Sequence, residues 1–429
     1  MEDFLYFFSF QDPNIRYVVV GSVLLAISAA IVGCFTFLKK RALIGDAVAH
    51  SVLPGVCLAF VVTGTKNPIY LIIGAFITGW ISLRFIDMIV RYSKLKEDTA
   101  IGLTLSVFFG LGILILTAIQ HSGNANQSGL DQFLFGKAAS LVGQDLIVFG
   151  SVSVILLLVV GLLFKELTLL AFDEQFGKAI GMPVKGLELV LTTLTVLAVV
   201  TGIQAVGVVL MAAMLITPAA AARFWTDKLT TMVFLAALFG AISGVSGAYI
   251  SFVAPAMPTG PWIVLVISFI AMSSFFIAPR KGILYKQFQQ RKYQKQILEE
   301  NILKAFFHLG EADEQYYGHR KISDLISQRR FVMGRLKGGL QKLVRSGFLK
   351  QDREGWVLTE EGKNKGQRIV KLHRLWELYL TEYLRIAPDH VHDEAETIEH
   401  IITPEIEARL EKKLNYPSVD PHNETIPYR

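Results

Sequence analysis

The chain has 429 residues, of which 52% are hydrophobic and 18% charged, and its formal net charge is +6 at pH 7. Soluble globular proteins carry about 25% charged residues, so this composition excludes an ordinary soluble chain. The two cysteines, Cys34 and Cys57, lie in separate apolar stretches, which excludes a disulfide framework or a zinc knuckle.

The part of the chain before Arg280 is far more apolar than the part after it, which indicates at least two domains. A helix needs about 20 apolar residues to cross a bilayer. The first part is therefore predicted to be an all-α polytopic membrane bundle of about eight to nine transmembrane helices. The predicted spans are Tyr17–Leu38, Ala42–Val62, Tyr70–Val90, Ala100–Ile119, Leu146–Phe164, Leu187–Thr201, Ala205–Ala222, Thr230–Phe252 and Trp262–Ala278.

Two of these segments, on either side of Gly202, are short for full crossings. Broken helices of this kind occur beside the substrate sites of transporters. We therefore expect either two short spans or a broken helix, with the interruption at Gly202.

Basic residues cluster at alternate ends of the predicted spans, whereas the intervening loops His121–Leu130 and Ala254–Pro261 hold almost none. The positive-inside rule then places the N-terminus outside and everything after Arg280 in the cytoplasm. The clusters are Lys39–Arg41, Arg84–Lys96, Lys165–Lys185, Arg223–Lys228 and Arg280–Lys281.

The second span contains a carboxylate and an imidazole, Asp46 and His50, in a run otherwise free of charge. Residues four apart share one face of a helix, about 6 Å apart along its axis. Ionisable residues inside spans point to function, and this pair suits a borderline divalent ion such as manganese, iron or zinc. The alternative is an aspartate near the helix start beside a buried, hydrogen-bonded histidine.

The first part contains several motifs in a fixed order, namely Phe37–Arg41 leading into Gly45–Gly55, Phe133–Gly136, Ala205–Leu210 with Leu215–Ala221, and Met257–Pro261. In order and spacing these motifs resemble the zinc/manganese/iron ABC permease family, over roughly Arg16 to Arg280. The resemblance implies a homodimeric permease that works with a separate ATPase and an extracytoplasmic metal-binding protein in a bacterial inner membrane. It also implies that Asp46 and His50 lie in the translocation path.

No G-x-x-x-x-G-K-[ST] loop occurs in the chain, so we expect no bound nucleotide and no enzyme activity here, with ATP hydrolysis supplied by the separate subunit. A cytoplasmic segment must then receive force from that ATPase. Phe172–Met182 is the candidate, because it is a short amphipathic turn of helix ended by Gly181 and Pro183, and it resembles the coupling segment of the family. Its coupling residues would be Asp173, Glu174, Phe176 and Gly181; the alternative is an ordinary interfacial loop.

After a basic connector, residues 281–298, the pattern predicts a cytoplasmic winged helix-turn-helix domain, residues 299–370. Helices are expected at Ile302–Phe307, Ile322–Ile326 and Val332–Val344, and a two-stranded wing at Gly347–Lys350 and Gly355–Thr359. The last of these helices carries the DNA-binding candidates Arg335, Lys337 and Lys342, which could contact phosphates from the major groove. A basic helix in a protein-binding winged helix is the alternative.

Metal-ligand residue types gather in the last part, residues 371–429. His373 and Glu377 lie four apart on one helix, and a second helix carries His392, Glu396, Glu399 and His400 on a single face. Carboxylates and imidazoles in this arrangement are typical of a transition-metal site.

The segments His373–Glu377, Val391–His400 and Pro417–His422 resemble the iron- and manganese-dependent repressor family, the group of the diphtheria toxin repressor. The resemblance implies a helical metal-binding and dimerisation domain with ligands at His373, Glu377, His392, Glu396, Glu399 and His400. One departure is that Asn301 and Lys304 stand near positions where the family's first helix supplies a further ligand, and a charged lysine cannot ligate.

The sequence therefore predicts the permease subunit of an ABC importer, spanning residues 1–280, for a divalent transition metal (manganese, iron or zinc). Its cytoplasmic appendage would sense metal and gate transport, or support the dimer. The alternative is a membrane-tethered or proteolytically released metal-dependent repressor that binds DNA, with the cut in Gln287–Leu298. A tethered repressor would find operators poorly, which favours transport.

Overall fold

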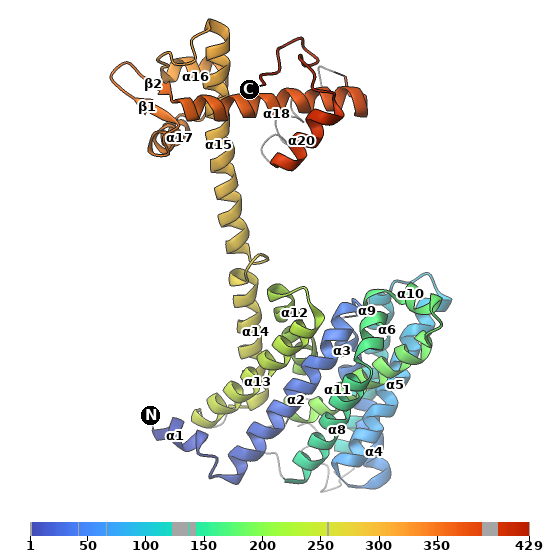
Figure 1. The fold of residues 1–429 in the computed structure, drawn as a ribbon. Helices are drawn as coiled ribbons and strands as arrows, with labels where there is room; N and C mark the ends of the chain where they lie inside the picture. The colour runs from blue at the N-terminus through green and yellow to red at the C-terminus, as the bar shows by residue number, and fades with distance from the viewer. Residues whose placement is uncertain are drawn as a thin grey trace. The chain divides into compact units, whose positions relative to one another are not determined.

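A computed structural model describes residues 2–41, 43–65, 67–121, 136, 143–254, 257–387 and 402–428. The chain folds into two compact units, Met1–Lys286 and Gln287–Arg429. The boundary lies inside the predicted connector, and each unit has its own hydrophobic core (Figure 1).

The first unit is helical throughout its described part (Figure 1). Within the described residues, eight helical segments are long and apolar enough to cross a membrane, one of them Ile44–Thr63, which comprises α3 and α4, and a shorter apolar helix covers Leu210–Trp225. This agrees with the predicted eight to nine spans. The helices are α1 Glu2–Phe8, α2 Pro13–Leu38, α3 Ile44–Ser51, α4 Leu53–Thr63, α5 Pro68–Tyr92, α6 Glu97–Gln120, α8 Gly143–Leu162, α9 Phe164–Phe172, α10 Glu174–Ala179, α11 Val184–Val206, α12 Val208–Trp225, α13 Leu229–Val253 and α14 Thr259–Ile277.

Helix α2 lies at the centre of the bundle and packs against α8, α11, α12 and α13, while α4 packs against α5 and α6. Small residues allow close crossings of this kind in membranes. At the α4–α5 crossing, a Cβ added to Gly55 would lie 2.1 Å from the carbonyl oxygen of Gly74. A side chain at either glycine would force these helices apart.

The interruption expected at Gly202 is instead at Gly207, so α11 continues past its predicted end at Thr201. Gly207 has φ 96° and ψ 161°, a conformation that is essentially restricted to glycine. Gly202 is a packing residue, because a Cβ there would lie 2.3 Å from the sulfur of Met211. The prediction located a break in this region but assigned it to the wrong glycine.

The second unit contains the predicted winged helix-turn-helix. Its core unites leucines and aromatic side chains of the three helices and both strands, among them Phe306, Leu336 and Leu340. The strands pair antiparallel with Leu349 opposite Leu358. The elements are α15 Ile283–Asp313, α16 Ile322–Gln328, α17 Met333–Arg345, β1 Leu349–Gln351 and β2 Trp356–Leu358.

The predicted connector segment Gln287–Leu298 is helical and forms part of α15. Beyond the wing, α18 Glu360–Leu384 and α20 Pro404–Lys413 pack together with the C-terminal segment around Leu375, Leu410, Leu414 and Ile426. The second predicted ligand helix, with His392, Glu396, Glu399 and His400, lies outside the described residues.

Candidate functional site

Asp46 and His50 lie on α3, inside the first unit, as the four-residue spacing predicted. The Asp46 Oδ1 and His50 Nε2 atoms are 3.5 Å apart, and the two side chains are 43% and 20% exposed. The edge of the His50 ring meets Phe109 of α6 at 5.1 Å between centroids. The pair is therefore partly open and is held from one side by an aromatic ring.

The helix that carries this pair stops one residue after His50, and α4 begins directly after Val52. Pro54 explains the interruption, because it has no N–H to donate to the carbonyl of His50 four residues earlier. The carbonyl of His50 therefore lacks the donor that a regular helix would give it, one residue before α3 ends.

Three buried polar atoms on α3 and α6 have no hydrogen-bond partner among the described residues, namely His50 Nδ1, Ser51 Oγ and Thr104 Oγ1. The two helices pack against each other. A polar atom that is buried without a partner costs free energy unless a ligand or water satisfies it. This part of the bundle can therefore offer a passing cation both a carboxylate–imidazole pair and further polar atoms.

The predicted coupling residues lie on or beside α10. Asp173 caps the helix by accepting a hydrogen bond from the backbone N–H of Phe176 at 2.9 Å. Phe176 is 54% exposed, and Gly181 ends the segment with φ 83°. The segment thus presents an aromatic side chain outward on a short, capped helix.

Glu174 points toward neighbouring cations instead of outward. Its carboxylate accepts hydrogen bonds from Lys178 at 2.6 Å and from Lys39 at 3.0 Å. These hydrogen bonds, that of Lys178 first, hold the pKa of Glu174 below its ordinary value. In the sequence Lys39 counted as a basic residue for topology and as part of the motif Phe37–Arg41, but its contact with Glu174 was not predicted, because residues so far apart in the chain leave no local pattern.

In the second unit, His373 Nε2 and Glu377 Oε1 lie 3.0 Å apart on α18, and both side chains are buried. They line a cavity of about 450 Å³ that also receives Asn301, Lys304 and His308 from α15. Asn301 Oδ1 is buried without a hydrogen-bond partner among the described residues. Asn301 and Lys304, the two residues that depart from the pattern of the repressor family, therefore line the same cavity as the predicted ligands His373 and Glu377.

A metal ion could use His373, Glu377 and the carbonyl oxygen of Asn301, which are borderline and hard ligands. The buried ammonium of Lys304 in the same cavity opposes a second positive charge. Among the described residues, no group of three His, Cys, Asp or Glu side chains could hold a metal ion. The pair would need the ligands predicted on the second helix.

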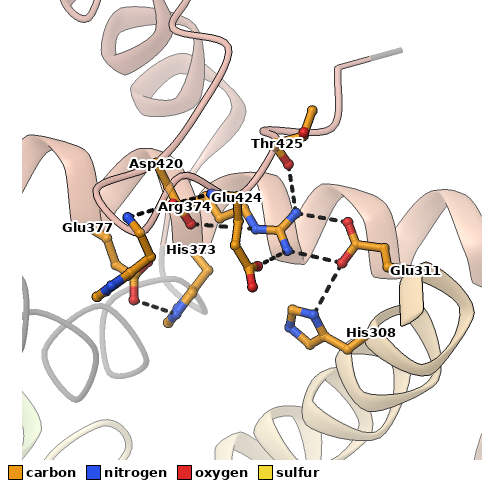
Figure 2. Close-up of polar contacts among 9 residues, drawn as sticks. His308, Glu311, His373, Arg374, Glu377, Asp420, Glu424 and Thr425 are labelled. Carbon is orange, nitrogen blue, oxygen red and sulfur yellow. Dashed lines mark hydrogen bonds and ion pairs between the residues drawn. The ribbon is translucent and has the colours of Figure 1, made fainter.

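Arg374, next to His373, joins three segments of the second unit (Figure 2). Its guanidinium donates to both carboxylate oxygens of Glu311 at 2.8 and 3.0 Å, to the carbonyl of Thr425 at 2.7 Å, and to Glu424. Burial alone would raise the pKa of Glu311, but hydrogen bonds from His308 and Arg374 outweigh it and lower that pKa. The network ties α15, α18 and the C-terminal segment together.

The DNA-binding candidates Arg335, Lys337 and Lys342 all lie on exposed positions of α17. Lys342 forms an ion pair with Glu299 of α15 at 2.6 Å. Arg335 and Lys342 also line a groove of about 600 Å³ between α15 and α17, together with Arg291, Lys295 and Arg345. The candidates thus belong to a basic surface, and two of them face the neighbouring helix.

Comparison with known proteins identifies both parts of the chain. Residues 11–278 match the ABC 3 transport family, and residues 359–428 match the iron dependent repressor, metal binding and dimerisation domain.

Among curated relatives, the manganese transport system membrane protein MntC of Bacillus subtilis is 41% identical, covering 88% of this chain and 86% of that protein. The zinc transport system membrane protein TroC of Treponema pallidum is 42% identical over 66% of this chain and 95% of its own length. Among solved structures, PsaBC from Streptococcus pneumoniae in complex with Fab matches 65% of this chain and 96% of that chain, at 36% identity and a TM-score of 0.58. The chain therefore belongs to the ABC 3 transport family and carries, after its membrane bundle, a domain of the iron dependent repressor metal-binding and dimerisation type.

Proposed function

We propose that this chain is the membrane-spanning permease subunit of an ABC importer for a divalent transition metal, manganese, iron or zinc. The observation that carries the proposal is the Asp46–His50 pair on a short helix inside an apolar bundle, beside buried polar atoms that lack partners. A dehydrated divalent ion needs such replacements for its water ligands. The names of the manganese and zinc relatives support the same class of substrate.

The proposal includes the partners of a permease of this kind. Two copies of the chain would form the pathway in a bacterial inner membrane, an extracytoplasmic metal-binding protein would deliver the ion, and a separate ATPase would supply energy. Phe176 would be the docking side chain on α10, with Asp173 and Gly181 defining the ends of the docking segment. The basic ends of the spans favour an arrangement in which α10 and the C-terminal unit are cytoplasmic.

Metal uptake by cells that carry altered chains tests the pathway. We expect Asp46→Ala together with His50→Ala to abolish uptake of the transported metal, while the protein remains inserted and bound to its ATPase. His121→Ala is a matched control, because that histidine is exposed at the end of α6. Normal uptake by the double variant would refute the role of this pair.

For the C-terminal unit we propose metal sensing, with His373 and Glu377 as ligands together with His392, Glu396, Glu399 and His400. Metal held there would adjust transport or dimer stability. The alternative, a DNA-binding repressor that uses Arg335, Lys337 and Lys342, is supported by the helix-turn-helix and wing. Detection of a free C-terminal fragment in cells would favour the repressor. Detection of the full-length chain alone, together with a change of metal uptake in His373→Ala, would favour gating of transport.

A further inference from the structure

Lys39, the residue at which α2 ends, connects three elements that are far apart in the sequence. Its ammonium donates to Glu174 of α10 at 3.0 Å and to Glu188 of α11 at 3.1 Å. The Lys39 side chain is only 12% exposed, although a lysine in a charged helix end is normally solvated. Its neighbour Lys40 is exposed, so the two adjacent lysines differ in environment.

The surroundings of Lys39 are polar and closely packed. A cavity of about 20 Å³, the size of a single water molecule, lies beside it and is also lined by Thr36, Glu188 and Thr195. The hydroxyls of Thr36 and Thr195 lie 3.2 Å apart and link α2 to α11 at this level. The ammonium therefore closes a polar junction between these helices.

The charges at this junction balance only with Lys39 in place. Glu174 has two cationic partners, Lys39 and Lys178, whereas Lys39 is the one cation among the described residues that forms an ion pair with Glu188. Without Lys39, Glu174 would keep only Lys178, and Glu188 would have no ion-pair partner among the described residues, since Arg41, which lines the same cavity, pairs with Asp87 and Glu97. The two carboxylates would then repel each other, and the junction would open.

The junction adjoins the helix of the proposed pathway. After Lys39 the chain makes a tight turn in which Lys40 has φ 60°, and α3, with Asp46 in its first turn, begins at Ile44. Helix α11, the other arm of the junction, packs directly against α3. Helix α10 also leads into α11 through residues 180–183 and contacts it, so α11 is one link from α10 to α3. Lys39 adds a second link, because it joins α10 directly to the end of α2 and, along the chain, to α3.

We propose that Lys39 is the positioning residue that fastens α10 to α2 and α11, so that motion imposed on α10 by the ATPase is transmitted to α3. This inference rests on the proposed transport function. It separates two residues that the sequence grouped together: Phe176 docks the ATPase, whereas Glu174 transmits the motion through Lys39. Loss of Lys39 should uncouple ATP hydrolysis from transport without preventing docking.

The test uses the complete transporter, with its ATPase, in proteoliposomes, and measures ATP hydrolysis and Mn²⁺ uptake on the same vesicles. We expect Lys39→Met to keep ATPase binding and hydrolysis but to lower uptake per ATP by about 10-fold or more, the size of a typical coupling free energy. Lys39→Arg, which can serve both carboxylates, should restore coupling. Lys40→Met removes the same charge one residue away and should leave both activities unchanged.

Two further variants keep the inference testable if Lys39→Met fails to assemble. Glu174→Gln removes the negative charge on α10 that pairs with Lys39, and it should uncouple ATP hydrolysis from transport in the same way. Lys178→Met removes the other partner of Glu174 and should leave hydrolysis and transport coupled. Normal uptake per ATP in both Lys39→Met and Glu174→Gln would overturn the inference, as would loss of ATPase binding in both. If the unaltered transporter imports none of Mn²⁺, Fe²⁺ and Zn²⁺ with ATP, the proposed function itself fails.

Discussion

Each unit contains a carboxylate–imidazole pair at four-residue spacing on a helix, and the two pairs have different environments. In the bundle, Asp46 and His50 are 3.5 Å apart with side chains 43% and 20% exposed. In the second unit, His373 and Glu377 are 3.0 Å apart with side chains 5% and 3% exposed. Both pairs adjoin buried polar atoms without partners among the described residues, but only the second also adjoins the ionic network of Arg374. A partly exposed pair suits an ion that is bound briefly and released, whereas a buried pair suits an ion that remains bound.

The largest effect that would sharpen this comparison is a loss of stability on breaking the ionic network of Arg374. Arg374→Ala would leave Glu311 and Asp420 without their buried cation, and breaking such a pair costs about 3–5 kcal/mol. We expect a lower unfolding temperature of the second unit, measured on the full chain by differential scanning calorimetry. Arg353→Ala, at an exposed position in the turn of the wing, should leave that temperature unchanged. An equal fall of the unfolding temperature in both variants would mean that the ion pairs of Arg374 make no specific contribution to stability.

A smaller effect is expected at the enclosed pair itself. Glu377→Ala removes a buried partner of His373, which costs about 1–3 kcal/mol. Added Mn²⁺ should raise the unfolding temperature of the second unit in the unaltered chain and much less in this variant, because a ligand stabilises the state that binds it. Glu382→Ala, an exposed residue of the same helix, is the control. A full response to Mn²⁺ in Glu377→Ala would exclude Glu377 as a ligand.

For the partly exposed pair, Asp46 and His50, we expect the opposite: its removal should hardly change stability. Asp46→Ala and His50→Ala are expected to change the stability of the bundle by less than about 1 kcal/mol, because a partly exposed contact between a carboxylate and an imidazole contributes little. Thermal unfolding of the purified chain in detergent measures this. A loss as large as that of Arg374→Ala would make the pair structural and remove the contrast between the units.

The smallest expected effect is the pH dependence of hydrogen exchange in α10. The pKa of Glu174 is lowered by Lys178 and Lys39, so its ion pairs contribute fully above the ordinary value of 4.5 and are lost as the pH falls through the lower, folded value. Hydrogen exchange of the α10 amides should therefore stay equally protected between about pH 7 and pH 5 and weaken only at more acid pH. Glu174→Gln should abolish this dependence. Loss of protection already near pH 6 would point to a histidine instead.

The length and apolar character of the spans made the bundle predictable, and alternating hydrophobic and turn residues did the same for the helix-turn-helix and wing. The break at Gly207 was assigned to Gly202, because both glycines follow apolar runs and only the folded chain shows that Gly207 has φ 96° while Gly202 packs against Met211. The junction at Lys39 was missed, since its partners lie far away in the chain. The roles of His392, Glu396, Glu399 and His400 stay predictions.

The division of the second span into α3 and α4 has a mechanical consequence. Helix α4 packs on α5, with Gly55 close to Gly74, and on α6, whereas α3 packs on α11 and α12 as well as on α5 and α6. Pro54 removes the hydrogen bond to the carbonyl of His50, whereas the Val52 N–H still donates to the carbonyl of Val48 and the Val52 carbonyl still accepts from the N–H of Val56. Bending at Val52 therefore strains one backbone hydrogen bond fewer than it would in a regular helix. Bending there would change the direction of α3, the shorter of the two helices, relative to α4, and Asp46 and His50 both lie on α3.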